Sequence, residues 1–153
     1  MRGLARDDNE VTAVPHYRIS WAVIVGINYR ELAGSARAEV PELGTAENDA
    51  QAVHDVLVNR YGYKPEHVRL LLGKDASREN IRKLFGDDFL GSKKQITAAD
   101  SVLFYFAGHG NRRETIDVKE QHVVLLYPHD VQLTINQGVD TISCLRIDEL
   151  LGY

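Results

Sequence analysis

Residues 100–110, Asp-Ser-Val-Leu-Phe-Tyr-Phe-Ala-Gly-His-Gly, constrain the fold more than any other stretch of this chain. Residues 102–106 are all large and apolar, with no polar residue between them. Such an uninterrupted run is typical of a strand buried on both faces, as in a parallel sheet covered by helices. We therefore expect an α/β fold with this strand at its centre.

A histidine, His109, follows this run and is flanked by Gly108 and Gly110. Glycine on both sides removes side-chain bulk around the imidazole and lets backbone N–H groups approach a ligand. Open α/β sheets place their active sites at the carboxyl ends of their strands. The position favours a general acid/base, and the alternative is a turn histidine without a chemical role.

The composition limits the classes of function. A length of 153 residues is that of one domain with a hydrophobic core. The net charge of −4 and the absence of a Lys/Arg cluster argue against a nucleic-acid partner. The apolar runs are far shorter than the roughly 20 residues of a membrane span. With one cysteine and no apolar N-terminal leader, we expect a cytoplasmic location and no membrane partner.

Strand and helix patterns alternate along the first two thirds of the chain. After a loose N-terminal arm at 1–20 and a loop at 28–44, Thr45 and Ser77 are the expected N-caps of the two helices. This alternation predicts right-handed crossovers in a parallel sheet. The expected elements are strands at 21–27, 68–72 and 102–106 and helices at 46–61 and 78–84, with residue 90 as an alternative end of the second helix.

The pattern changes after Gly110. Residues 111–121 are polar and leave no room for a crossover helix, yet 122–127 have the pattern of another strand. A parallel return normally needs a dozen or more residues. We therefore expect an antiparallel excursion near the active-site edge, then a polar loop to Thr141 and a helix starting at 145–151.

Four segments, in this order and spacing, carry a resemblance to a known family: 22–28, 43–50, 61–63 and 104–110. The chain resembles the front, p20-type portion of caspase-like cysteine peptidases, most closely the metacaspase and prokaryotic caspase-homologue branch. The resemblance spans residues 21–153. It implies a caspase-like three-layer α/β sandwich, a mostly parallel sheet with helices on both faces, whose second half is missing and whose sheet is incomplete at the C-terminus.

The resemblance also implies roles for particular residues. His109 would be the histidine of a Cys-His dyad, and the backbone N–H of Gly110 would contribute to the oxyanion hole. Asp49 would line the specificity pocket and select Arg or Lys, with Ala107 and Gly108 beside it in substrate binding. Ala46 and Ala107 differ from the cysteine and serine often found in metacaspases. Without the resemblance, Asp49 is an acid in the first turn of a helix.

The nucleophile is harder to assign. Cys144 is the only cysteine, and it follows Thr141-Ile142-Ser143 rather than a long apolar strand. It is also closer to His109 than the roughly 50 residues of the caspase spacing. We expect Cys144 to be a small, partly buried residue at a helix start. The nucleophile would then lie beyond Tyr153 or on another chain, and the 153 residues alone would not hydrolyse peptides.

Two other functions are alternatives to a peptidase. A non-catalytic caspase-like module for interaction or regulation would keep the fold without the cysteine. A nucleotide-binding domain is disfavoured because Gly-Ile-Asn-Tyr-Arg at 26–30 is not a phosphate-binding loop. The expected partners are a protein or peptide substrate and the C-terminal remainder of the domain or a second chain.

Some metacaspases need calcium. Asp130, Asp148 and Glu149 could belong to an acidic site, but the sequence contains no recognisable calcium-binding loop. No cofactor or metal is therefore predicted.

Overall fold

The computed structural model describes residues 17–30, 32, 40–86, 88–91, 96–114, 122–134, 138–139 and 143–151. Most of the expected N-terminal arm, the middle of the expected loop at 28–44 and residues 152–153 lie outside these ranges. The parts that position the candidate site lie within them.

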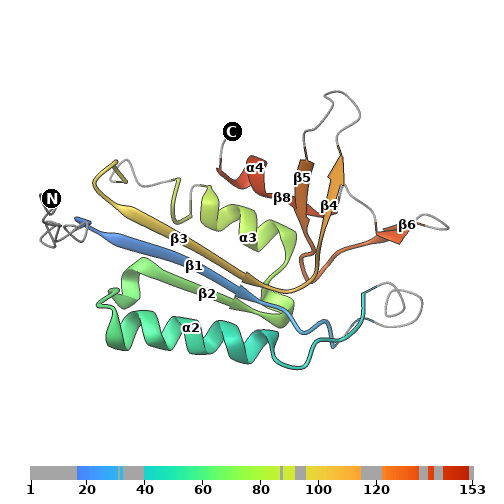
Figure 1. The fold of residues 1–153 in the computed structure, drawn as a ribbon, viewed down its shortest axis with the longest axis horizontal. Helices are drawn as coiled ribbons and strands as arrows, with labels where there is room; N and C mark the ends of the chain where they lie inside the picture. The colour runs from blue at the N-terminus through green and yellow to red at the C-terminus, as the bar shows by residue number, and fades with distance from the viewer. Residues whose placement is uncertain are drawn as a thin grey trace, which may run out of the picture.

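Three parallel strands form the main sheet in the order β2-β1-β3 (Figure 1). They are β1 (Ser20–Gly26), β2 (Val68–Leu72) and β3 (Ser101–Ala107). The short 3-10 turns η1 (Pro65–His67) and η2 (Gly73–Asp75) precede and follow β2. These strands confirm the parallel sheet predicted from the alternating sequence pattern.

Helices cover both faces of this sheet. α2 (Ala46–Arg60) and α3 (Arg78–Phe85) lie on opposite sides of it in Figure 1. Because side chains alternate along a strand, Ala22 and Ile24 belong to the α2 core, whereas Val23 and Val25 pack in the other core, with Ile81 of α3. The result is the predicted three-layer sandwich.

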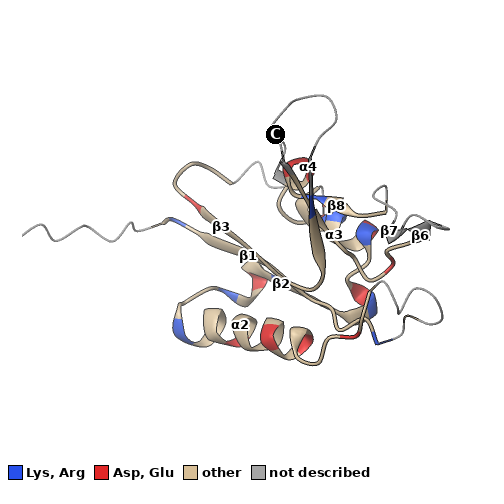
Figure 2. Ribbon diagram, turned by 45° about the vertical axis from the view of Figure 1, so that its right-hand side comes forward, with Lys and Arg blue, Asp and Glu red and all other residues tan. Residues whose placement is uncertain are grey.

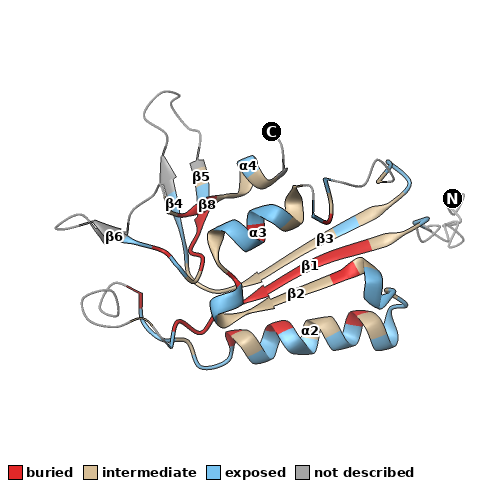
Figure 3. Ribbon diagram, turned by 180° about the vertical axis from the view of Figure 1, so that it is seen from behind, coloured by how far each residue is buried: buried red, intermediate tan, exposed pale blue. Residues whose placement is uncertain are grey.

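Within the described residues, the expected central strand at 102–106 lies at the edge of the main sheet. The central strand is β1, whose residues 21–26 are all buried, whereas β3 is mostly half-buried and Val102 is 46% exposed (Figure 3). Among the strands that the structure describes, β3 pairs only with β1, so its outer edge is open. An apolar run indicates that a strand can bury its side chains, but it does not indicate which strand lies in the middle of the sheet.

A second, antiparallel sheet follows β3. It contains β4 (Gly110–Glu114), β5 (His122–Leu126) and β8 (Leu145–Arg146), which confirms the antiparallel excursion. The polar residues 111–114 pair as part of β4, and the expected polar loop includes the paired strands β6 (Leu133–Thr134) and β7 (Gly138–Val139). The last helix, α4, spans Ile147–Leu151, so Leu145 precedes it. No helix in the described ranges is long and apolar enough to cross a membrane.

The N-terminus of α2 is capped by a residue distant in sequence. Thr45 occupies the N-cap position, but its hydroxyl donates to Asp49 Oδ2 at 3.0 Å and caps no backbone N–H. The Glu47 N–H instead donates to Asn28 Oδ1 at 3.3 Å, and the Asn28 N–H donates to Glu47 Oε1 at 3.1 Å. This reciprocal pair, equivalent to a capping box, links the end of β1 to the start of α2.

The N-terminus of α3 agrees with the prediction. Ser77 Oγ accepts from the Asn80 N–H at 3.2 Å, and Asp130 Oδ1 accepts from the Arg78 N–H at 2.7 Å. The helix ends at Phe85 and does not continue to residue 90, because the chain turns at Gly86.

The capping by Asn28 is testable by substitution. We expect Asn28→Ala to lower the free energy of unfolding by about 1 kcal/mol, because a side-chain cap of α2 is lost in a buried position. Thr45→Ala, the matched control, should change it by less than about 0.5 kcal/mol. Urea unfolding followed by circular dichroism measures both. A larger loss for Thr45→Ala than for Asn28→Ala would contradict this assignment.

Candidate active site

The candidate site lies where the carboxyl ends of β1 and β3 meet. From β1 the chain passes through α2 to β2 on one side and then through α3 to β3 on the other, so the strand order reverses at β1, the topological switch point of the sheet. Connections that leave neighbouring strands in opposite directions create the crevice in which open α/β sheets bind ligands. The residues that follow these two strands, Tyr29 and His109, have ring centroids 5.0 Å apart.

The imidazole of His109 is oriented by a backbone carbonyl. Its Nε2 lies 2.7 Å from the carbonyl oxygen of Pro41, in the connection between β1 and α2. Because a carbonyl only accepts hydrogen bonds, Nε2 carries a proton in this arrangement. In a neutral imidazole, Nδ1 then has the free lone pair and is the atom able to accept a proton. This arrangement suits a general acid/base.

The hydroxyl of Tyr29 supports the backbone at His109. It accepts from the His109 N–H at 2.9 Å and donates to the carbonyl of Tyr127 at 2.6 Å. Tyr127 in turn donates its N–H to the carbonyl of His109 at 2.9 Å. The residue at position 29 therefore connects the loop after β3 with the end of β5.

Tyr29 is buried and has an unusual backbone conformation. Its exposed fraction is 1%, and its φ of 59° lies in the left-handed region. Burial raises the pKa of the Tyr29 hydroxyl well above its usual range, although the hydrogen bond from the His109 backbone acts in the opposite direction. The hydroxyl is therefore neutral at physiological pH and keeps the proton that it donates to Tyr127.

The glycines beside His109 are required by contacts within the protein. A Cβ on Gly108 would lie 2.8 Å from the Tyr29 hydroxyl oxygen and 2.8 Å from Phe106 Cε1. A Cβ on Gly110 would lie 2.8 Å from the carbonyl oxygen of Leu125, across the β4–β5 ladder. These close contacts within the chain favour glycine at both positions, in addition to the access for a ligand expected from the sequence.

The other predicted site residues lie at the same edge of the sheet. Ala107 ends β3 opposite Gly26, and its carbonyl accepts from the Ile27 N–H at 2.9 Å. Asp49 lies in the first turn of α2, along which Figure 2 shows several acidic residues. It is exposed and accepts from Thr45; within the described part of the chain, the structure gives it no hydrogen bond or ion pair to His109.

Cys144 is buried away from solvent. Its exposed fraction is 2%, it packs in the same core cluster as Tyr29, and its carbonyl accepts from Arg78 Nε at 3.1 Å. It precedes β8 rather than opening a helix, but its burial agrees with the structural role predicted for it. A substrate cannot reach this sulfur without rearrangement of the core.

The carboxylates considered for calcium do not come together. Asp148 and Glu149 both pair with Arg146, whereas Asp130 accepts from the first N–H of α3. Over the described ranges, no group of three or more acidic, histidine or cysteine side chains is arranged to hold a metal ion.

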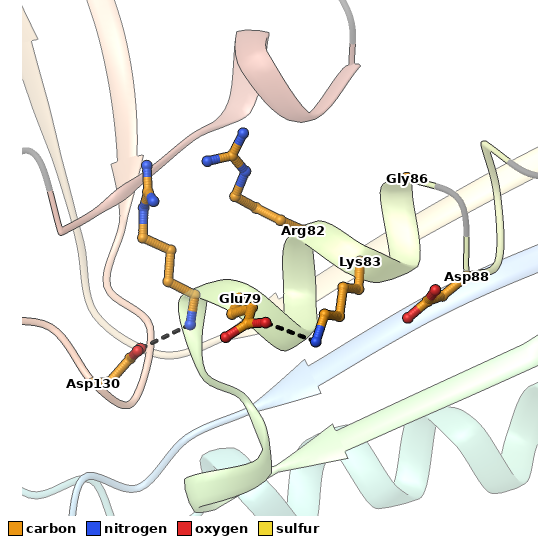
Figure 4. A pocket seen from close by; sticks show the side chains of 7 residues that line it. Glu79, Arg82, Lys83, Gly86, Asp88 and Asp130 are labelled. Atoms are coloured by element: carbon orange, nitrogen blue, oxygen red, sulfur yellow. Dashed lines mark hydrogen bonds and ion pairs between the residues drawn. The ribbon is translucent and has the colours of Figure 1, made fainter.

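Two cavities lie near these elements. One of about 290 Å³ borders Tyr29 at the ends of β1 and β2, and its lining mixes cations such as Lys74 with acids such as Asp75. The other, of about 580 Å³, runs along α3 and is lined by Arg78 and Arg82 among others; within it Glu79 binds Lys83 at 2.7 Å (Figure 4). In both cavities, positive and negative side chains occur together, so neither selects a charged ligand by its sign alone.

Fold and site together define a class: three-layer α/β domains with a histidine at the switch point of the sheet. A family model described as "Metacaspase, peptidase C14 domain" matches residues 21–147. The chain is 30% identical to metacaspase-1 of Kluyveromyces lactis over 135 residues, 84% of this chain and 29% of that protein. It is 32% identical to metacaspase-1 of Cryptococcus neoformans (71% of this chain, 23% of that protein) and 29% to metacaspase-4 of Arabidopsis thaliana (60% and 20%).

The chain therefore belongs to the metacaspase family of caspase-type cysteine peptidases, peptidase C14, and the resemblance stated from its motifs is confirmed. It spans less than a third of the length of these three relatives.

The environment of Tyr29 predicts its behaviour in alkali. Because folding raises the pKa of this hydroxyl above its unfolded value of about 10, its contribution to stability is complete below that pH. The contribution decreases as the pH rises above about 10 towards the folded pKa. We expect the folded chain and Tyr29→Phe to gain the same phenolate absorbance up to about pH 10.5. A smaller gain in Tyr29→Phe over that range would show that Tyr29 ionises in the folded state.

Proposed function

We propose that this chain is the histidine-bearing portion of a cysteine endopeptidase domain that cleaves after Arg or Lys by means of a Cys-His dyad. The observation that carries the proposal is the orientation of His109: an imidazole at the switch point whose Nε2 lies against the Pro41 carbonyl, so that Nδ1 is the nitrogen able to accept a proton. Family membership supports the reaction class.

In this proposal, His109 moves one proton between two partners. Nδ1 accepts the proton of a cysteine thiol, and the thiolate attacks the peptide carbonyl. The Pro41 carbonyl, 2.7 Å from Nε2, stabilises the positive charge that the imidazole then carries. The proton passes to the leaving amine, and the backbone N–H of Gly110 is the proposed donor to the oxyanion.

The nucleophile of this proposal is not Cys144. That residue is the only cysteine in the sequence, and its sulfur is buried in the core. We propose that the cysteine is carried by the C-terminal remainder of the domain or by a second chain, which pairs with the open edge of β3. The 153 residues alone would then be inactive.

Specificity for Arg or Lys is proposed for Asp49, with Ala107 and Gly108 in the wall of the same subsite. Asp49 is exposed in the first turn of α2, at the edge of the sheet where β1 and β3 end. A carboxylate there would pair with a guanidinium or ammonium group of the substrate. The proposal includes a protein or peptide substrate, a cytoplasmic location and no cofactor, nucleic-acid partner or membrane partner.

A non-catalytic caspase-like module is the second candidate. The observation that favours it is the burial of the only cysteine, since a module retained for interaction needs no accessible thiol. The presence or absence of a cysteine on the strand that pairs with β3 discriminates between the two functions.

The first experiment measures peptidase activity on fluorogenic peptides that end in Arg, Lys or Asp. It compares this chain, a protein that continues through the nucleophile-bearing strand, and the same longer protein with His109→Ala. We expect cleavage after Arg or Lys by the longer protein only, and a loss of at least about 1,000-fold in kcat with His109→Ala. If the longer protein folds but cleaves none of the peptides, the non-catalytic module is favoured. Activity of the 153 residues, abolished by Cys144→Ala, would refute the assignment of the nucleophile.

The role of Asp49 is tested separately in the active longer protein. Asp49→Asn should lower kcat/KM for Arg and Lys peptides by roughly 100-fold, because the substrate cation loses its charged partner. The matched control is Asp55→Asn, which removes the same charge from an exposed position of the same helix and should leave kcat/KM within about twofold. Equal effects of the two variants would mean that Asp49 has no role in substrate specificity and is only an acidic residue in the first turn of α2.

A further inference from the structure

We propose that Tyr29 is a positioning residue that holds His109 in its working orientation through the Tyr29 hydroxyl. The inference rests on the proposed function only for the work that His109 does; the contacts themselves belong to the described structure. His109 receives support at two places: its backbone N–H donates to Tyr29 and its ring nitrogen contacts the Pro41 carbonyl.

The hydroxyl connects two backbone groups that do not pair with each other. It accepts from the His109 N–H at 2.9 Å and donates to the Tyr127 carbonyl at 2.6 Å. Together with the bond from the Tyr127 N–H to the His109 carbonyl, it ties both backbone groups of the histidine to neighbouring segments. A hydroxyl performs this function because it donates and accepts at once.

The conformation of Tyr29 is costly. A bulky residue rarely adopts a positive φ, because the backbone is strained there, yet the φ of Tyr29 is 59°. The surrounding structure maintains it: the side chain is 1% exposed, and its ring lies against the imidazole at an interplanar angle of 37°. A strained residue whose polar atom binds the loop of the candidate base is consistent with a constraint imposed by function.

The neighbouring glycine makes room for this hydroxyl. Because a Cβ at position 108 would stand 2.8 Å from the hydroxyl oxygen, Gly108 and Tyr29 depend on each other. This gives two independent ways to disturb the contact. Tyr29→Phe removes the oxygen and keeps the ring, whereas Gly108→Ala keeps the oxygen and crowds it together with the Phe106 ring.

The test uses NMR of the 153-residue chain, so it does not depend on peptidase activity. It measures the exchange with solvent of the His109 imidazole Nε2–H and of the His109 amide proton. In both variants we expect these two protons to exchange at least about tenfold faster, because the loop loses its anchor. Amides of β1 should change by less than about twofold. The matched control, Tyr105→Phe, removes a hydroxyl from β3 in the other core cluster and should leave both His109 protons unchanged.

Each outcome of the exchange measurement either supports or overturns the positioning role of Tyr29. Faster exchange confined to His109 and its neighbours, in both variants, supports a positioning role. Unchanged exchange of the imidazole proton in Tyr29→Phe would overturn it. A parallel loss of protection throughout the sheet, or failure of both variants to fold, would also overturn it and make Tyr29 a core residue only. Loss of the proposed peptidase mechanism would instead show as activity retained by His109→Ala in the longer protein.

Discussion

The short segment that follows β1 connects the sheet, the helix and the candidate base, and the remainder of the site depends on it. Asn28 caps α2 through Glu47, Tyr29 supports His109, and the Ile27 N–H binds the end of β3. These bonds join segments that are far apart in sequence but meet at one edge of the sheet. Since residues 21–26 of β1 are all buried, the end of this strand is held by the core and is a suitable place from which to position a reactive side chain.

Much of the fold follows from local sequence patterns. The three parallel strands, both helices and the N-cap at Ser77 were predictable because each depends on residues a few positions apart. The identity of the central strand was not, because burial of β1 and exposure of Val102 depend on strand order. The hydrogen bonding at the N-terminus of α2 was not predictable either: Thr45 occupies the N-cap position, but Asn28, seventeen residues earlier in the sequence, provides the acceptor.

The candidate site was only partly predictable, for the same reason. The Gly-His-Gly motif and the apolar run before it identify His109 as a candidate, and the structure places it at the switch point. The Pro41 carbonyl could not be predicted, because a backbone acceptor leaves no trace in residue type. Tyr29 was missed because neither positive φ nor a bond to a residue eighty positions away can be inferred from Gly-Ile-Asn-Tyr. Cys144, by contrast, was predictable as a structural residue, because no long apolar strand precedes it in the sequence. Its burial agrees with that prediction.

Gly26 has a consequence for how such a domain can vary. A Cβ at this position would lie 2.6 Å from the Ala46 carbonyl oxygen and 2.6 Å from Ala50 Cβ, so the first turn of α2 sits directly on the backbone of β1. A single added methyl group would have to lift that turn, and Asp49 with it. The geometry of an exposed carboxylate is thus coupled to a residue in the interior of the sheet. Under the role proposed for Asp49, a packing substitution that touches no substrate would then alter substrate preference.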